Sequence, residues 1–69
     1  MAPVRIDARG MRCPWPALRL AKALRTAEGP VEVLADDPVA PRELAAVAAA
    51  NLWSLETIAD GHFRAVRTP

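Results

Sequence analysis

The strongest constraint on the fold is a proline-rich stretch, residues 10–16, that holds the only thiol of the chain. The segment before it, Val4 to Asp7, alternates apolar and polar residues as a half-buried strand does. The segment after it, Ala17 to Ala27, repeats apolar residues at helical spacing. Prolines are tolerated in a helix's first turn because the N–H groups there have no intrahelical partner. The stretch therefore marks a strand-to-helix junction, with Cys13 at or just before the N-terminus of the helix.

The rest of the chain predicts one more helix and three more strands. Val31 to Ala35 alternates like the first strand and is expected to be the second. A helix is predicted from Pro41 to Ala50 or Asn51, because the residue before a proline avoids helical angles. Ser54 to Ala59 and Phe63 to Arg67 are short extended runs. They are joined through Asp60-Gly61, which is a strong hairpin signal.

These elements, in the order βαβαββ, predict a single α+β domain over residues 1–69. The first two strands flank one helix, which predicts a right-handed crossover and parallel strands. We expect two layers, a four-stranded mixed sheet with both helices on one face, and the strand order stays open. Val4 and Ile6 are expected to face the core. The other face is expected to alternate out to water and to carry Arg5, Glu32, Glu56 and Arg64.

Composition narrows the class of protein. The net charge of +1 gives no general attraction to membranes or nucleic acid, and a nucleic-acid-binding module would need a basic excess or an aromatic platform. One cysteine allows no internal disulfide, no Cys-x-x-Cys redox pair and no two-cysteine metal site. The sequence contains no apolar run of membrane-spanning length and no stretch like a signal peptide. We therefore expect a cytoplasmic protein.

Two interpretations of Cys13 follow from its surroundings. At a helix N-terminus, the helix dipole and the free N–H donors favour the thiolate, and Arg12 and Arg9 add positive charge. A lone cysteine in a small domain is otherwise commonly an inert packing residue. The arginine, tryptophan and prolines around it are a poor setting for burial. We expect an activated thiol whose pKa lies below its ordinary value.

Asp36 and Asp37 follow the second strand. In a parallel βαβ unit, helix N-termini and strand C-termini gather at one edge of the sheet, so this pair is expected beside the Cys13 loop. One interpretation is turn and capping chemistry ahead of the next helix. The other is that one of them hydrogen-bonds the Cys13 loop and supports it. Because a carboxylate near sulfur opposes thiolate formation, its role there would be positioning or proton handling.

Three side chains are candidates for contact with a partner protein. Trp15 stands between two prolines beside the thiol, where an exposed aromatic residue favours a partner, although it is equally compatible with folding back over the first helix. Arg19 shares a basic helix face with Lys22, which is either solvated or meets an acidic partner. Arg9 precedes the thiol loop. His62, beside the hairpin turn, is expected at the surface and is not assigned to catalysis.

The motif around the thiol resembles that of a known family. Gly10-x-x-Cys13-Pro14-x-Pro16, at the end of a first strand and before a helix, is similar to the Cys-Pro-x-Pro motif of TusA/SirA-like sulfur carriers. Further likenesses follow in the family's order: Ile6 to Gly10 with its Leu-Asp-x-x-Gly lead-in, Ala35 to Pro38 with its acidic strand end, and Gly61 before an apolar final strand. The chain departs from the family at Glu43-Leu44, where an acidic residue and isoleucine are usual, and this departure bears on partner contacts.

The resemblance implies a sulfurtransferase that carries sulfur without a metal or an organic cofactor. Cys13 would attack the terminal sulfur of a donor persulfide, become a persulfide itself and relay that sulfur to an acceptor protein. The donor would be a protein such as a cysteine desulfurase or a rhodanese. In this scheme Arg12 stabilises the thiolate. Pro14 and Pro16 shape the loop and the helix start that present it.

The pathway served stays open among tRNA thiolation, molybdenum-cofactor assembly and sulfur oxidation. The alternative to a sulfur carrier is a non-catalytic module of the same fold, with Cys13 as a redox-sensing or structural residue in a regulatory interaction. Gain of a sulfur atom on Cys13 distinguishes the two.

Overall fold

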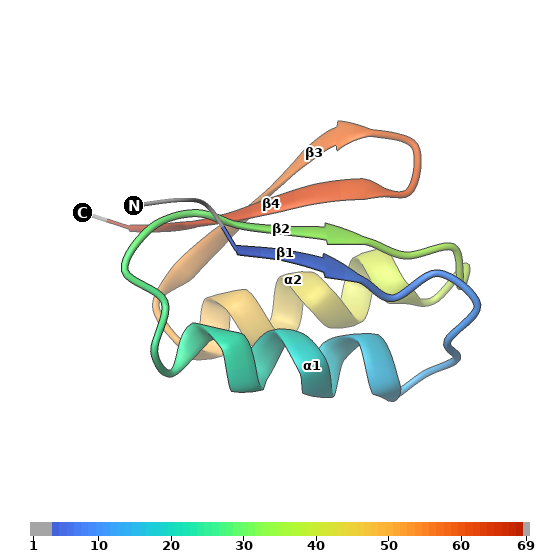
Figure 1. The fold of residues 1–69 in the computed structure, drawn as a ribbon, viewed down its shortest axis with the longest axis horizontal. Helices are drawn as coiled ribbons and strands as arrows, with labels where there is room; N and C mark the ends of the chain where they lie inside the picture. Colours follow the sequence, from blue (N-terminus) through green and yellow to red (C-terminus); the bar gives the residue numbers. More distant parts are fainter. Residues whose placement is uncertain (1–3, 69) are drawn as a thin grey trace.

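The sheet has four strands in the order β1-β2-β4-β3, and both helices cover one of its faces (Figure 1). The computed structural model describes residues 4–68. The elements are β1 (Val4–Asp7), α1 (Trp15–Leu24), β2 (Val31–Leu34), α2 (Ala40–Ala50), β3 (Trp53–Ala59) and β4 (His62–Arg67). β1 and β2 are parallel, whereas β4 runs antiparallel to both β2 and β3. The predicted two-layer α+β fold is confirmed, and β4 lies between β2 and β3.

Helix α1 differs most from its predicted bounds. It begins at Trp15 and has Pro16 in its first turn, where the missing N–H costs nothing. It ends at Leu24, but the chain continues to turn through tighter bonds, from Arg25 N–H to the Lys22 carbonyl and from Thr26 N–H to the Ala23 carbonyl, both 3.3 Å long. The predicted helix extended to Ala27 because the apolar spacing continues through this tightened turn, although α1 itself ends at Leu24.

The core fills the space between the sheet and the two helices. Its largest fully buried side chains are Leu20 from α1, Leu44 from α2, and Val31 and Val33 from β2. Trp53 is buried at the start of β3, and the Arg67 guanidinium lies 5.3 Å from its ring centroid. α1 packs on β1 and β2, α2 packs beside β3, and the two helices pack against each other, which sets how their N-termini lie relative to each other.

One predicted core residue is not buried. Ile6 is enclosed, but Val4, on the same face of β1, is 42% exposed. Val4 begins an edge strand, so a neighbouring strand covers it on the side of Val31 alone. The alternation of apolar and polar residues in β1 therefore predicts the strand correctly but not the burial of its first residue.

The second face of the sheet carries a row of alternating charges, which we call the open face. Arg5, Glu32, Arg64 and Glu56 lie opposite one another in register across β1, β2, β4 and β3. The closest nitrogen–oxygen distances along the row are 3.9, 3.7 and 3.8 Å. These four residues were predicted on this face, and their opposite charges meet across each strand pair.

Helix length bears on membrane association. None of the helices within residues 4–68 has the length and apolar character that a membrane crossing demands.

Candidate functional site

The loop between β1 and α1 is fastened to the end of β2. Ala8 N–H donates to the Leu34 carbonyl at 2.7 Å, so strand pairing continues one residue past β1. Gly10 then turns the chain with a φ of +81°, a conformation that residues with a side chain rarely adopt. The Gly10 N–H donates to Asp36 Oδ1 at 3.0 Å. The turn predicted at Gly10 therefore also contacts the aspartate pair that follows β2.

Cys13 is exposed and is held through both its backbone and its sulfur. Its N–H donates to Asp37 Oδ2 at 2.7 Å, and its Sγ–H donates to Glu43 Oε1, also at 2.7 Å. The next residue, Pro14, caps α1, and its carbonyl accepts the N–H of Leu18. The thiol thus lies directly before the α1 N-terminus, at the place the prolines predict. We call this region, formed by loop 8–14, connection 35–39 and the first turn of α2, the thiol edge.

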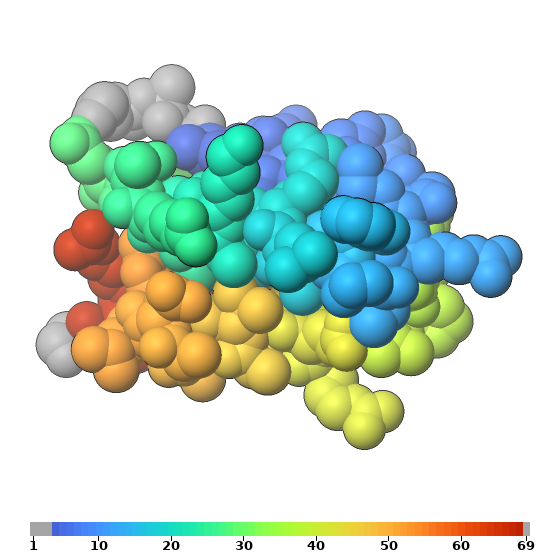
Figure 2. All heavy atoms as spheres, turned by 90° about the horizontal axis from the view of Figure 1, so that it is seen from below, coloured from blue at the N-terminus to red at the C-terminus, as the bar shows by residue number. Residues whose placement is uncertain are grey.

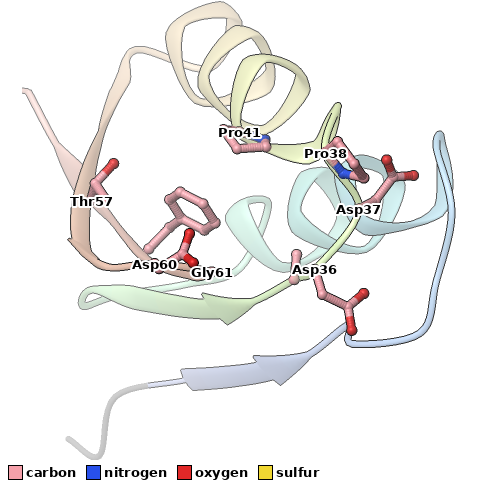
Figure 3. A pocket seen from close by; sticks show the side chains of 9 residues that line it. Asp36, Asp37, Pro38, Pro41, Thr57, Asp60 and Gly61 are labelled. Atoms are coloured by element: carbon pink, nitrogen blue, oxygen red, sulfur yellow. The ribbon is translucent and has the colours of Figure 1, made fainter.

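Asp37 makes both contacts considered for the aspartate pair, one in the turn ahead of α2 and one to the Cys13 loop. Its Oδ1 accepts the N–H of Val39 at 3.0 Å, the turn contact ahead of α2, while its Oδ2 accepts the N–H of Cys13. These two bonds lower the pKa of Asp37, and the positive charge of Arg12 contributes in the same direction. Figure 3 shows Asp36 and Asp37 directing their carboxylates toward the segment that follows β1. One carboxylate thereby joins the turn after β2 to the thiol loop.

The expected fall in the thiol pKa is contradicted. The pKa of Cys13 is raised, first by the hydrogen bond from its thiol to Glu43 and further by the negative charges of Glu43 and Asp37. A carboxylate in direct contact with the sulfur opposes ionisation of the thiol, since an anion there repels the thiolate. The positive charge of Arg12 lowers the pKa of Asp37, and its stabilisation of the Cys13 thiolate stays a prediction.

Glu43 is the thiol contact that sequence reasoning missed. It is 30 residues from Cys13 and was singled out only as a departure from a family pattern. A signal was present, because α2 begins at Ala40, one residue before the predicted start at Pro41, and the N-termini of both helices lie at the same sheet edge. A residue in the first turn of α2 therefore faces the start of α1.

The three partner-contact candidates differ in their surroundings. Trp15 is 60% exposed, so α1 leaves most of its surface uncovered. Arg9 pairs with Asp7 through bonds of 2.9 and 2.8 Å, which lower the pKa of Asp7 to about 2. Arg19 donates to the Asp7 carbonyl at 3.1 Å. Arg9 and Arg19 therefore brace the end of β1, whereas Trp15, two residues after the thiol, remains exposed. Figure 2 views the helical face, where the thiol loop, in blue, lies at one end of α1.

His62 lies apart from these contacts. It is half-buried, less exposed than predicted, and its Nε2 lies 2.9 Å from Glu32 Oε1. This hydrogen bond is the main cause of a lowered Glu32 pKa. His62 therefore belongs to the open face, in agreement with its omission from the thiol chemistry.

Two hollows flank the connection between β2 and α2. One, of about 490 Å³, lies on the side of the thiol loop and is lined by Gly10, Met11, Arg12, Asp36, Asp37 and Pro38. The other, of about 470 Å³, lies toward the β3–β4 hairpin, where Figure 3 shows Thr57, Asp60 and Gly61 on one side and Pro41 on the other. Within the described part of the chain, no three histidine, cysteine, aspartate or glutamate side chains gather as metal ligands. The arrangement suits chemistry at an accessible sulfur atom.

Comparisons with known proteins agree with this geometry. A family model described as sulfurtransferase TusA matches residues 4–67. Among solved structures, a SirA-like protein from Desulfitobacterium hafniense is 31% identical, with a TM-score of 0.74 over 90% of each chain. No curated protein matches the chain significantly.

Proposed function

Because this chain belongs to the TusA sulfurtransferase family, we propose that Cys13 accepts a sulfane sulfur as a persulfide and relays it to an acceptor protein. The observation that carries the proposal is the position of the thiol. Cys13 is exposed directly before α1, and its backbone is fixed by Asp37 while its sulfur stays at the surface. A carrier needs such access, since its sulfur must meet two partners in turn.

The chemistry is two successive exchanges at sulfur. In loading, Cys13 Sγ bonds to the terminal sulfur of a donor persulfide, the donor's S–S bond breaks, and its electron pair leaves on the donor thiolate. In delivery, a nucleophile on the acceptor attacks the terminal sulfur of the Cys13 persulfide, and Cys13 leaves as thiolate. Each step forms one bond to sulfur and breaks another, so neither step needs an added oxidant, reductant or metal.

The other predicted residues take supporting roles in this proposal. Pro14 and Pro16 shape the loop and the first turn of α1, and Asp36 and Asp37 hold the loop through the N–H groups of Gly10 and Cys13. Trp15 offers a partner an exposed aromatic surface beside the thiol. The partners are a persulfide donor of the cysteine desulfurase or rhodanese class and a downstream sulfur-acceptor protein.

Intact-mass spectrometry tests the proposal. Incubation with a cysteine desulfurase and cysteine, or with a rhodanese and thiosulfate, is expected to make the protein one sulfur atom heavier, and a reductant is expected to remove that atom. Cys13→Ser is expected to stay at its starting mass and to fold normally, because the thiol is exposed. A parent protein that gains no sulfur from either donor would favour a regulatory module instead. Equal gain by Cys13→Ser would show that the sulfur is bound elsewhere.

A further inference from the structure

The contact between Cys13 and Glu43 joins the thiol to a proton acceptor on a different helix. We propose that Glu43 is the general base of loading, taking the Cys13 thiol proton as the sulfur bonds to the donor's terminal sulfur. This inference rests on the proposed sulfur-carrier function and adds a catalytic residue to it. It is carried by geometry, since Glu43 Oε1 lies 2.7 Å from Cys13 Sγ, within the distance that direct proton transfer requires.

The position of Glu43 is set by the core. It lies in the first turn of α2, and the next residue, Leu44, is fully buried and anchors that turn. Glu43 itself is half-buried, so its side chain has less freedom than an exposed glutamate. Its carboxylate therefore meets the thiol from a rigid element, and the thiol loop is fastened on the other side by Asp37.

Asp37 is the second carboxylate that faces the thiol, but its oxygens are already engaged. One accepts the Val39 N–H and the other accepts the Cys13 N–H. Both bonds favour its ionised form, as does the charge of Arg12, so Asp37 is a poor proton acceptor. Glu43 receives its hydrogen bond from the thiol itself. The two carboxylates thus have different roles: Asp37 positions the backbone of Cys13, and Glu43 accepts the thiol proton.

The proposed step balances without any added reactant. The Cys13 S–H proton moves to Glu43 as Cys13 Sγ bonds to the donor's terminal sulfur. The donor's S–S bond breaks, and its electron pair leaves on the donor sulfur. Glu43, now protonated, passes the proton to that leaving thiolate. The net change converts the Cys13 thiol and the donor persulfide into the Cys13 persulfide and the donor thiol.

The same contact should make the resting thiol favour loading from a persulfide over simple alkylation. A thiol held protonated by Glu43 reacts slowly with electrophiles that need a preformed thiolate. Removal of the carboxylate should therefore have opposite effects on two reactions. It should speed simple alkylation near neutral pH, because more thiolate is present, and it should slow loading from a persulfide. A purely structural role of Glu43 would move both reactions in the same direction.

Glutathione persulfide is a suitable donor for the test, since a small molecule makes no protein–protein contact with α2. The full chain is mixed with it, quenched at intervals and weighed by intact-mass spectrometry. Glu43→Gln removes the base with little change in size, and Glu43→Asp keeps a carboxylate one methylene shorter. Glu28→Gln removes the same charge beyond the C-terminal end of α1, whereas the thiol lies before its N-terminus. Iodoacetamide alkylation is measured for each variant across pH.

We expect Glu43→Gln to load about a hundredfold more slowly at neutral pH, within the usual range for loss of a general base. Glu43→Asp should recover part of the rate, and Glu28→Gln should match the parent. Alkylation of Glu43→Gln should reach its half-maximal rate at lower pH than in the parent.

Two outcomes would overturn the inference, and they are distinguishable. If the parent loads but Glu43→Gln loads equally fast or faster, the carboxylate only raises the thiol pKa, while the sulfur-carrier function stands. If the parent itself gains no sulfur from glutathione persulfide or from the protein donors, the proposed function and this inference are both wrong.

Discussion

The thiol edge and the open face of the sheet both gather carboxylates, but they pair them differently. On the open face, Glu32 lies between Arg5 and Arg64 and accepts a hydrogen bond from His62, so its charge meets basic groups on every side. At the thiol edge, Asp37 meets backbone N–H groups and Glu43 meets a thiol.

The difference shows how one residue type serves two purposes. A carboxylate and an arginine that pair across strands neutralise each other's charge. Such pairs add little to the free energy of unfolding and serve mainly strand register and solubility. Carboxylates aimed at a loop backbone and a sulfur atom fix a reactive group and alter its protonation. Comparing matched substitutions in the two regions therefore separates function from support.

Apart from the Glu43 variants, the largest difference is expected from removing one carboxylate charge in each region. Asp37→Asn loses the ionised acceptor that fixes the Cys13 N–H, so sulfur loading should slow on the order of tenfold through poorer positioning of the sulfur. Glu32→Gln, on the open face, should load at the parent rate. Loading kinetics by intact mass, with folding checked by circular dichroism, measure both. Equal slowing in the two variants would remove the distinction between the regions.

The two regions should also respond to opposite ends of the pH scale. The pKa of Glu32 is lowered in the fold, so its stabilising contribution is present above its ordinary value of 4.5 and is lost as the pH falls through the lowered value. The pKa of Cys13 is raised, so its contribution is present below the ordinary value of 9.0 and is lost as the pH rises through the raised value.

Thermal unfolding across pH measures this contrast. The difference in Tm between the parent and Glu32→Gln should shrink in acid. In alkali, the parent should lose stability relative to Cys13→Ser, because the contribution of the thiol is lost there. Glu43→Gln should abolish most of the alkaline change, since its carboxylate is the main cause of the raised thiol pKa. An alkaline response that persists in Glu43→Gln would assign the effect to another group.

The smallest effect is expected within the row of charges on the open face. Arg64 lies 3.7 Å from Glu32 and 3.8 Å from Glu56, both at partly exposed positions. Arg64→Ala should lower the Tm by a few degrees at most, and added salt should reduce the difference between variant and parent. Sulfur loading should be unchanged. A marked loss of loading in Arg64→Ala would show that the open face takes part in the reaction after all.

Several features of the fold could be predicted because their causes are local. The prolines of residues 10–16 place the start of α1 within two residues, and Asp60-Gly61 marks the β3–β4 turn. The charge alternation predicts that Arg5 and Glu32 lie on the open face. The position of β4 between β2 and β3 was beyond such reasoning, since it depends on which long-range strand pairing buries the most apolar surface.

The sequence by itself determined where the thiol lies along the chain, which elements flank it, and that an aspartate pair ends the neighbouring strand. The tertiary structure alone decided that Glu43, 30 residues away, contacts the sulfur and raises its pKa. The physical reason is that periodicity and turn chemistry act over a few residues. A pKa depends on distances of a few ångströms between charges, and those distances are set by how α1 and α2 pack against each other and against the sheet.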